Sequence, residues 1–114
     1  MEIEGPGQAI TAYIGEGDHW LGKPLVNALV ERLRAEGFAG VTVTRGLLGF
    51  GAHSHIHSAN ILQLSQDLPL VLTLVDTEPR ATLALAIFEE MISEGLITVH
   101  EVKIVKYRHG EPQA

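Results

Sequence analysis

Leu70-Val71-Leu72-Thr73-Leu74-Val75-Asp76-Thr77-Glu78-Pro79 decides the fold, because it joins a buried strand to the start of a helix. Residues 70–75 are a nearly continuous apolar run of strand length, which predicts a strand covered on both faces. Residues 76–79 supply polar capping groups and an early proline, which are typical of a helix start. The apolar residues of this second helix are Leu83, Ile87, Phe88 and Met91. Gly95 is its expected end.

The sequence before this stretch has the same alternation of strand and helix periods. Residues 9–14 (AITAYI) alternate as a half-buried strand does. Residues 25–33 carry an apolar stripe at helical spacing, and Pro24 and Gly37 mark the two ends of this first helix. Residues 41–44 (VTVT) alternate again as a strand, and residues 61–64 could add a short strand or a turn of helix.

The last strand is expected over residues 96–107. Its apolar phase slips between Val99 and Val102, which indicates a bulge or a division into two short segments. The order βαββαβ is that of an α+β, ferredoxin-like fold, in which two helices cover one face of a four-stranded antiparallel sheet. We expect one domain over residues 1–114, and self-association to cover the second apolar face of its sheet.

The composition excludes several classes of protein. With 46% hydrophobic and 19% charged residues the chain is an ordinary globular protein. A net charge of −6 and only 8 Lys and Arg residues argue against nucleic-acid binding, which needs clustered cations. No apolar run reaches the roughly 20 residues of a membrane helix, and residues 1–8 do not have the pattern of a signal peptide, so a cytoplasmic location is expected. The absence of cysteine excludes disulfides and thiolate metal sites.

A long loop is expected at about residues 46–66, and it begins with a glycine-rich stretch. Glycines at 46, 49 and 51 leave the backbone free to turn its N–H groups toward a phosphate or carboxylate, and Arg45 adds positive charge. The alternative is a simple turn in which Phe50 packs into the core. The length and composition of this loop nominate it as the functional site.

The same loop contains His53, His55 and His57. In an extended segment this spacing places all three imidazoles on one side, within reach of one zinc, copper or nickel ion. No evident fourth ligand accompanies them, and histidines on a loop are commonly solvated. A divalent metal is therefore an alternative ligand of the loop. We expect the protein to require no cofactor.

Several segments then agree, in order, with one family. They are Gly15-Glu16-Gly17-Asp18 with Gly22-Lys23-Pro24-Leu25, residues 45–52 (RGLLGFGA), Ile56-His57, Asp67-Leu68-Pro69, Glu94-Gly95-Leu96-Ile97, and the basic end Lys106-Tyr107-Arg108-His109-Gly110-Glu111. Together they resemble the PII signalling proteins, and more closely the small, mostly uncharacterised bacterial and archaeal PII-like proteins. The resemblance covers nearly the whole chain.

The resemblance implies a homotrimer with inward-facing sheets, which binds an adenine nucleotide (AMP, ADP or ATP) between subunits and regulates a membrane transporter or an enzyme through the long loop. It implies sensing, not catalysis, and no nucleophile with its base is evident. The nucleotide-binding role maps onto Gly49, Phe50, Gly51 and Ala52 for the base and onto Lys106 and Arg108 for the phosphates. Alternation puts these two cations on one face, and Arg45 or Lys23, beside a helix N-terminus, could assist.

One departure from the PII pattern bears on the choice of nucleotide. PII proteins carry a lysine in the turn after the second helix that holds the terminal phosphates. Here the turn reads Gly95-Leu96-Ile97-Thr98-Val99-His100, without a lysine. AMP, ADP or an adenylyl-containing second messenger is therefore expected at least as much as ATP. The loop also lacks a tyrosine, so uridylylation is not expected.

Overall fold

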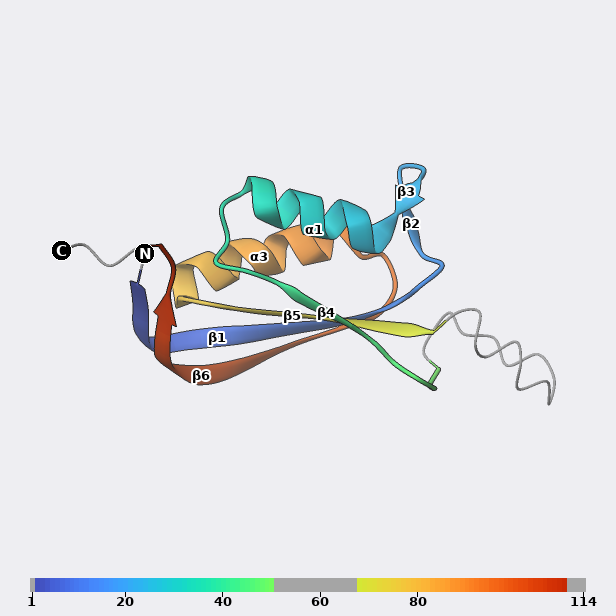
Figure 1. Ribbon diagram of the computed structural model, residues 1–114. Coiled ribbons are helices and arrows are strands. Elements are labelled where there is room, and N and C mark those ends of the chain that lie inside the picture. Colours follow the sequence, from blue (N-terminus) through green and yellow to red (C-terminus); the bar gives the residue numbers. More distant parts are fainter. Residues whose placement is uncertain (1, 51–67, 111–114) are drawn as a thin grey trace.

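The computed structural model describes residues 2–50 and 68–110 (Figure 1). The elements along the chain are β1 (Glu2–Gly15), β2 (His19–Trp20), β3 (Lys23–Pro24), α1 (Leu25–Ala35), β4 (Thr42–Arg45), β5 (Pro69–Asp76), α3 (Glu78–Met91) and β6 (Leu96–Arg108). The strand or helical turn expected at residues 61–64 lies outside the described residues.

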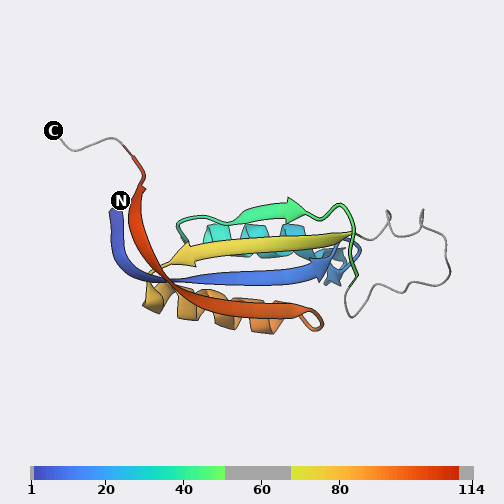
Figure 2. The ribbon, with the colours of Figure 1, turned by 90° about the horizontal axis from the view of Figure 1, so that it is seen from below.

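The four longer strands form one antiparallel sheet in the order β4-β5-β1-β6. The central strands β1 and β5 pair from Gln8 opposite Asp76 to Gly15 opposite Pro69. Both helices cover the same face of this sheet, and the view from below shows no described element over the other face (Figures 1 and 2). The ferredoxin-like α+β fold predicted from the sequence is confirmed.

The core lies between the sheet and the two helices. It consists of the inward side chains of β1 and β5, Ile10, Ala12, Ile14, Leu70, Leu72 and Leu74, and of the inner faces of the helices, Leu25, Ala28, Leu29, Leu33, Ala81, Ala84, Ile87, Phe88 and Met91. Leu83, which the sequence placed on the apolar stripe of α3, is 53% exposed because the buried stripe passes through its neighbours Ala81 and Ala84 instead. No helix in the described ranges is long and apolar enough to cross a bilayer.

The end of α3 differs from the prediction. The helix stops at Met91, before Gly95. Gly95 has φ +152°, and a Cβ atom there would lie 2.6 Å from the carbonyl oxygen of Tyr13. The glycine is therefore required where the chain passes close to β1 on its way into β6, and not as the helix cap.

The strands β1 and β6 are also more continuous than predicted. β6 runs unbroken through Val99 and Val102, which lie on opposite faces of the sheet. The break predicted there is wrong. Both faces of β6 carry some apolar residues, so the alternation of apolar and polar residues shifts phase in the sequence although the strand has no bulge at this point. The register shifts further on, where the residues between Ile104 and Tyr107 face Glu4 of β1.

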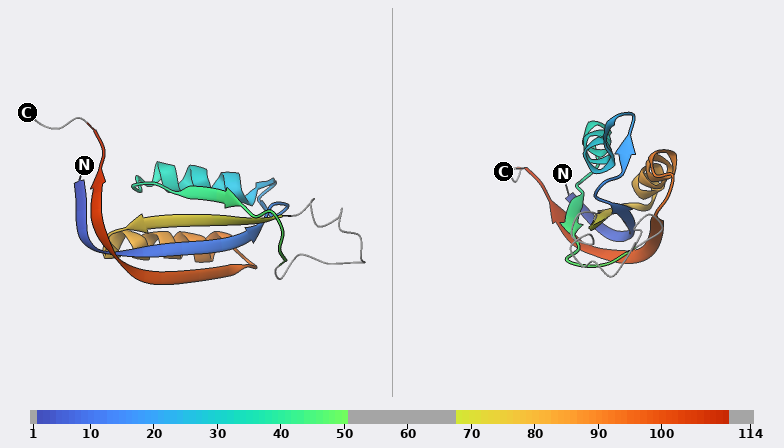
Figure 3. Two further views of the ribbon diagram at one scale, coloured as in Figure 1. Left: turned by 60° about the horizontal axis from the view of Figure 1, so that its bottom comes forward. Right: turned by 90° about the vertical axis from the view of Figure 1, so that its right-hand side faces the viewer.

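Beyond this shift, β1 and β6 continue as a two-stranded extension of the sheet. Glu2 lies opposite Arg108 and Ile3 opposite Tyr107. The extension bends out of the main sheet toward the side that carries the helices (Figures 1 and 3). Residues 2–8 were not predicted as a strand, because two acids and a Gly-Pro-Gly stretch hide the strand pattern.

The uncovered face of the sheet carries a row of threonines, one from each strand. The register places Thr42, Thr73, Thr11 and Thr98 side by side across the sheet. Apolar residues flank this threonine row, and Tyr13, Val75 and Leu96 among them are 42%, 40% and 55% exposed. The second apolar face expected from the sequence is therefore present, and no described residue of the same chain covers it.

Candidate functional site

The glycine-rich segment leaves the sheet at the end of β4 and lies against Pro69. The N–H of Gly46 donates a 2.7 Å hydrogen bond to the carbonyl oxygen of Pro69. A Cβ atom would lie 2.7 Å from Pro69 Cγ at Gly46 and 3.2 Å from it at Gly49. These glycines therefore permit a close approach of two chain segments. The expectation that Gly46 turns its N–H toward an anion is wrong, because a carbonyl already accepts from it.

Large apolar side chains follow at once and are exposed. Leu47 is 94%, Leu48 68% and Phe50 72% exposed in the single chain. The alternative in which Phe50 packs into the core is therefore excluded for the isolated chain. Sequence reasoning did not single out Leu47 and Leu48, although two leucines that fit no helical or strand period were a usable signal. This segment offers apolar surface to a ligand or to another protein.

The cations at this end of the sheet are engaged by carboxylates. Arg45 Nε lies 2.6 Å from Glu16 Oε2, and Arg45 Nη2 donates a 3.0 Å hydrogen bond to Glu16 Oε1. Lys23 Nζ lies 3.2 Å from Glu31 Oε2. The pair of Lys23 with Glu31 is exposed and the pair of Arg45 with Glu16 is partly exposed, so solvent screens both pairs. A phosphate group could exchange with either carboxylate.

The second candidate group lies at the end of β6. Lys106 and Arg108 are exposed on the same face of the strand as Glu2, and Arg108 Nε lies 3.0 Å from Glu2 Oε1. Within the described ranges Lys106 has no carboxylate at ion-pair distance. The end of β6 therefore presents two cations in one direction, as an anion such as a phosphate requires.

Tyr107, between these cations, points to the opposite side. Its hydroxyl donates a 3.0 Å hydrogen bond to the carbonyl oxygen of Ala39, in the turn between α1 and β4. The N–H of Ala39 donates to Asp76 Oδ2 at 3.3 Å. Asp76 is 3% exposed, and its other carboxylate oxygen accepts from the N–H of Thr77 at 2.8 Å. Sequence reasoning treated Asp76 only as a helix cap and missed its contact with this turn.

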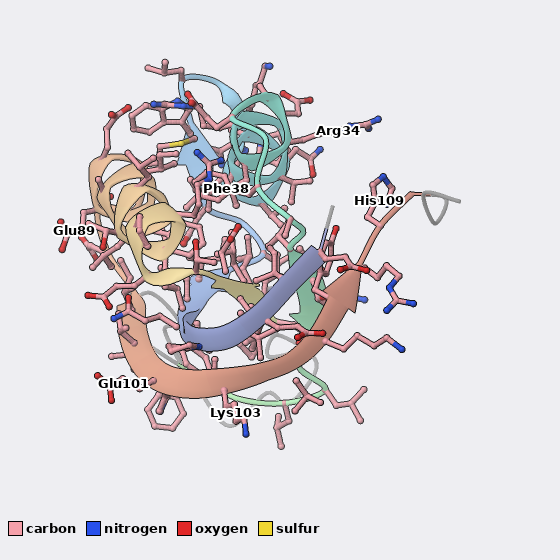
Figure 4. The ribbon with its side chains drawn as sticks, turned by 90° about the vertical axis from the view of Figure 1, so that its left-hand side faces the viewer. Arg34, Phe38, Glu89, Glu101, Lys103 and His109 are labelled. Carbon is pink, nitrogen blue, oxygen red and sulfur yellow. The ribbon has the colours of Figure 1, made fainter. Side chains whose placement is uncertain are left out.

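The same turn is also held by α3. Arg80 lies over the ring of Phe38, 4.3 Å from its centre, and donates a 2.6 Å hydrogen bond to the carbonyl oxygen of Glu36. Figure 4 shows Phe38 at the ends of the two helices, with Arg34 pointing away from them. A cavity of about 250 Å³ lies beside the turn and is lined by Val30, Leu33, Arg34, Phe38, Ala39, Gly40 and Val41.

The two groups of predicted site residues lie at opposite ends of the sheet. Arg45 is aligned through β5 with Ile14 of β1, whereas Arg108 lies opposite Glu2 (Figures 1 and 3). The twelve residue steps between these two positions of β1 correspond to about 40 Å of strand. One chain therefore does not bring Gly49 and Phe50 together with Lys106 and Arg108.

The rest of the predicted site lies outside the described residues. This applies to Gly51 and Ala52 and to the three loop histidines, His53, His55 and His57. In the part of the chain that the structure describes, no group of three or more His, Asp or Glu side chains could hold a metal ion. Metal binding by the loop histidines stays a prediction.

Comparison with known structures identifies the fold. A structure of CPII bound to ADP and bicarbonate, from Thiomonas intermedia K12, is similar to this chain with a TM-score of 0.61 and 19% sequence identity. The similarity covers 87% of this chain and 88% of that chain. The fold is thus that of a PII-like protein, as the resemblance in sequence implied.

The chain belongs to the DUF190 family, described as Uncharacterized ACR, which matches residues 7–104. It is 32% identical over 95 residues to a UPF0166 protein of Aquifex aeolicus, with 82% of this chain and 88% of the relative covered. It is 30% identical over 95 residues to a UPF0166 protein of Methanocaldococcus jannaschii, with 82% and 87% covered. The family match includes residues 45–52 and ends before Lys106 and Arg108.

Proposed function

We propose that the protein is a PII-like regulator without catalytic activity, which binds an adenine nucleotide between the subunits of a homotrimer. The observation that carries the proposal is the separation of the two half-sites at opposite ends of one sheet. A second copy of the chain can supply the half that each end lacks. CPII, whose fold is similar, was solved with ADP bound.

In this proposal the phosphates bind the end of β6. Lys106 and Arg108 face the same way, and among the residues that the structure describes only Arg108 has a carboxylate partner there, Glu2. A phosphate can accept charge-assisted hydrogen bonds from both cations. Arg45 and Lys23 of the neighbouring subunit would assist by exchanging Glu16 and Glu31 for the ligand, at the small cost that solvent-screened ion pairs carry.

The adenine base would bind the glycine-rich segment of the neighbouring subunit. Gly49 lies against Pro69, and the exposed ring of the next residue, Phe50, offers an aromatic face for stacking. Gly51 and Ala52 would complete this contact. The adjacent Leu47 and Leu48, with the long loop, would contact the regulated protein, a membrane transporter or an enzyme of the cytoplasm.

The trimer in this proposal covers the second face of the sheet. Tyr13, Val75 and Leu96 are partly exposed there in one chain. Burying apolar area contributes about 25 cal/mol per Å², so association through this face stabilises the protein. Sheets that face inward leave the helices, the glycine-rich segment and the end of β6 at the periphery, where two subunits can meet.

Calorimetric titration of the purified protein with AMP, ADP and ATP tests the ligand. We expect AMP and ADP to bind at least as tightly as ATP, because residues 95–100, which the structure places at the start of β6 and not in a turn, contain no lysine for an added phosphate. Absence of binding by all three nucleotides would refute the proposal. A clear preference for ATP would mean that another residue replaces the missing lysine.

Two charge deletions test the phosphate half-site. Lys106→Ala or Arg108→Ala removes one charge-assisted contact of about 1.5–3 kcal/mol, so ADP affinity should fall roughly ten- to a hundredfold. Lys103→Ala is the matched control, because Lys103 is exposed on the same strand and points away from the helices (Figure 4). An equal loss in the control would indicate a general effect of charge.

Mixed trimers test whether the site lies between subunits. Arg108→Ala removes one half-site and Phe50→Ala the other, so each variant alone should bind ADP poorly. After unfolding and refolding together, some interfaces combine the intact β6 end of one chain with the intact Phe50 of another. Recovery of binding in the mixture is the expected result. No recovery, in trimers verified to be mixed, would place both half-sites on one chain.

A second candidate function is metal binding through His53, His55 and His57, and their alternating spacing is the observation that favours it. Both functions can reside in one trimer, because the nucleotide contacts proposed above do not use these imidazoles.

A further inference from the structure

Tyr107 differs from the two cations on either side of it. Lys106 and Arg108 are exposed, whereas Tyr107 is half-buried and directs its hydroxyl to the carbonyl oxygen of Ala39. The two-stranded end of β1 and β6 lies beyond the register shift and bends out of the main sheet. The Tyr107 hydroxyl links this extension to the turn at residues 36–40 through its hydrogen bond.

The turn that accepts this bond is itself rigidly held. The buried carboxylate of Asp76 accepts from the N–H of Ala39, so both backbone groups of Ala39 are bound by side chains from other elements. Arg80 covers Phe38 and donates to Glu36 in the same turn. Ala39 is therefore a fixed point of the fold, to which the hydroxyl of Tyr107 fastens the end of β6.

We propose that Tyr107 is a positioning residue, whose hydroxyl fixes the direction in which Lys106 and Arg108 face. The inference rests on the proposed phosphate-binding role of these two cations. Because neighbouring side chains of a strand point to opposite faces, the anchor on one face determines where the cations on the other face lie. Because this hydrogen bond already orders the strand end in the free protein, ligand binding does not have to lose conformational entropy there.

Tyr107→Phe tests the proposal, with Tyr13→Phe as the matched control. Tyr13 is the other tyrosine of the chain, and its hydroxyl makes no hydrogen bond to another described residue. Hydrogen exchange of the backbone amides at residues 105–108 should become about three- to tenfold faster in Tyr107→Phe, the effect of one neutral hydrogen bond. Tyr13→Phe should leave these rates unchanged.

ADP titration provides the second measurement. Tyr107→Phe should lower ADP affinity about three- to tenfold while the trimer and the circular dichroism spectrum persist. In an Arg108→Ala background Tyr107→Phe should lower ADP affinity by a smaller factor, because Tyr107 acts partly through Arg108. If the two residues acted independently, the two factors of affinity loss would multiply. A purely structural role would not produce this coupling.

The outcomes separate the inference from the proposed function. Wild-type exchange rates at residues 105–108 in Tyr107→Phe would overturn the inference, and so would unchanged ADP affinity in a variant with faster exchange. If the wild-type protein binds no adenine nucleotide, the proposed function fails, and the exchange rates alone decide whether Tyr107 fixes the strand end.

Discussion

Arg45 and Glu16 form a two-bond ion pair at the point where the glycine-rich segment leaves the sheet. Arg45 Nε lies 2.6 Å from one carboxylate oxygen of Glu16, and Arg45 Nη2 donates to the other at 3.0 Å. The geometry is the one that a guanidinium uses with a phosphate group. Glu16 therefore occupies the place that a ligand phosphate would take on Arg45.

Glu16→Gln should raise ADP affinity several-fold, because it removes a negative charge and the competing partner of Arg45. The free energy of unfolding should fall by less than about 1 kcal/mol, since the pair is partly exposed and solvent screens it. Glu31→Gln is the parallel variant for Lys23. Calorimetric titration measures both affinities, and weaker binding in Glu16→Gln would mean that Glu16 orients Arg45 for the ligand.

Gly46→Ala should destabilise the protein by about 1–3 kcal/mol, because its Cβ would lie 2.7 Å from Pro69 Cγ. Gly40→Ala is the control, since a Cβ there meets nothing within 4 Å. That substitution should be neutral or stabilise by up to about 1 kcal/mol. Urea unfolding at equal chain concentration gives both values, and equal stability of the two variants would show that Pro69 can move aside.

Light scattering coupled to size exclusion should report about three times the chain mass of 12.3 kDa. Thr73→Lys should dissociate this trimer, because it places a charge in the centre of the threonine row on the uncovered face. Thr82→Lys makes the same change on the exposed surface of α3 and should leave the trimer intact. A wild-type monomer at micromolar concentration would refute the proposed assembly.

The loop histidines should bind zinc or nickel, and binding should weaken below about pH 6 because imidazole must be neutral to ligate a metal. Replacing His53, His55 and His57 with alanine should abolish the calorimetric signal. Replacing the other three histidines, His19, His100 and His109, gives a matched control with the same number of imidazoles removed. Equal binding by the two triple variants would mean that the alternating spacing has no special role.

Most of the fold could be predicted from hydrophobic periodicity. The start of α1 after Pro24 and of α3 after Thr77 were visible, because caps and prolines are local signals. The pairing of Glu2 with Arg108 was not visible, since it depends on a partner strand about a hundred residues away in a sequence that is poor in strand formers. The position of the bulge was predicted wrongly because the register of a strand depends on its partner strand, which the sequence of β6 alone does not show.

Candidate side chains for the site could be named from the sequence, but the partners that they have in the structure could not. The alternation of Lys106 and Arg108 gave their common face, and the resemblance to PII proteins gave their role as an expectation. The ion pair of Arg45 with Glu16 joins residues 29 positions apart, and that of Lys23 with Glu31 joins residues 8 positions apart, so neither pair has the short spacing that a helix pattern reveals. The bond from Tyr107 to Ala39 was hidden likewise, because its acceptor is a backbone carbonyl.

The threonine row can determine how the uncovered sheet faces of different copies of the chain align when they pack together. Apolar surfaces attract without direction, so two of them can slide along the strands at little cost. Hydroxyl groups that become buried must be hydrogen-bonded, and four of them in a line across the strands meet partners at one offset only. Flanked by apolar residues, Thr42, Thr73, Thr11 and Thr98 would thus make one packing arrangement more stable than its shifted neighbours.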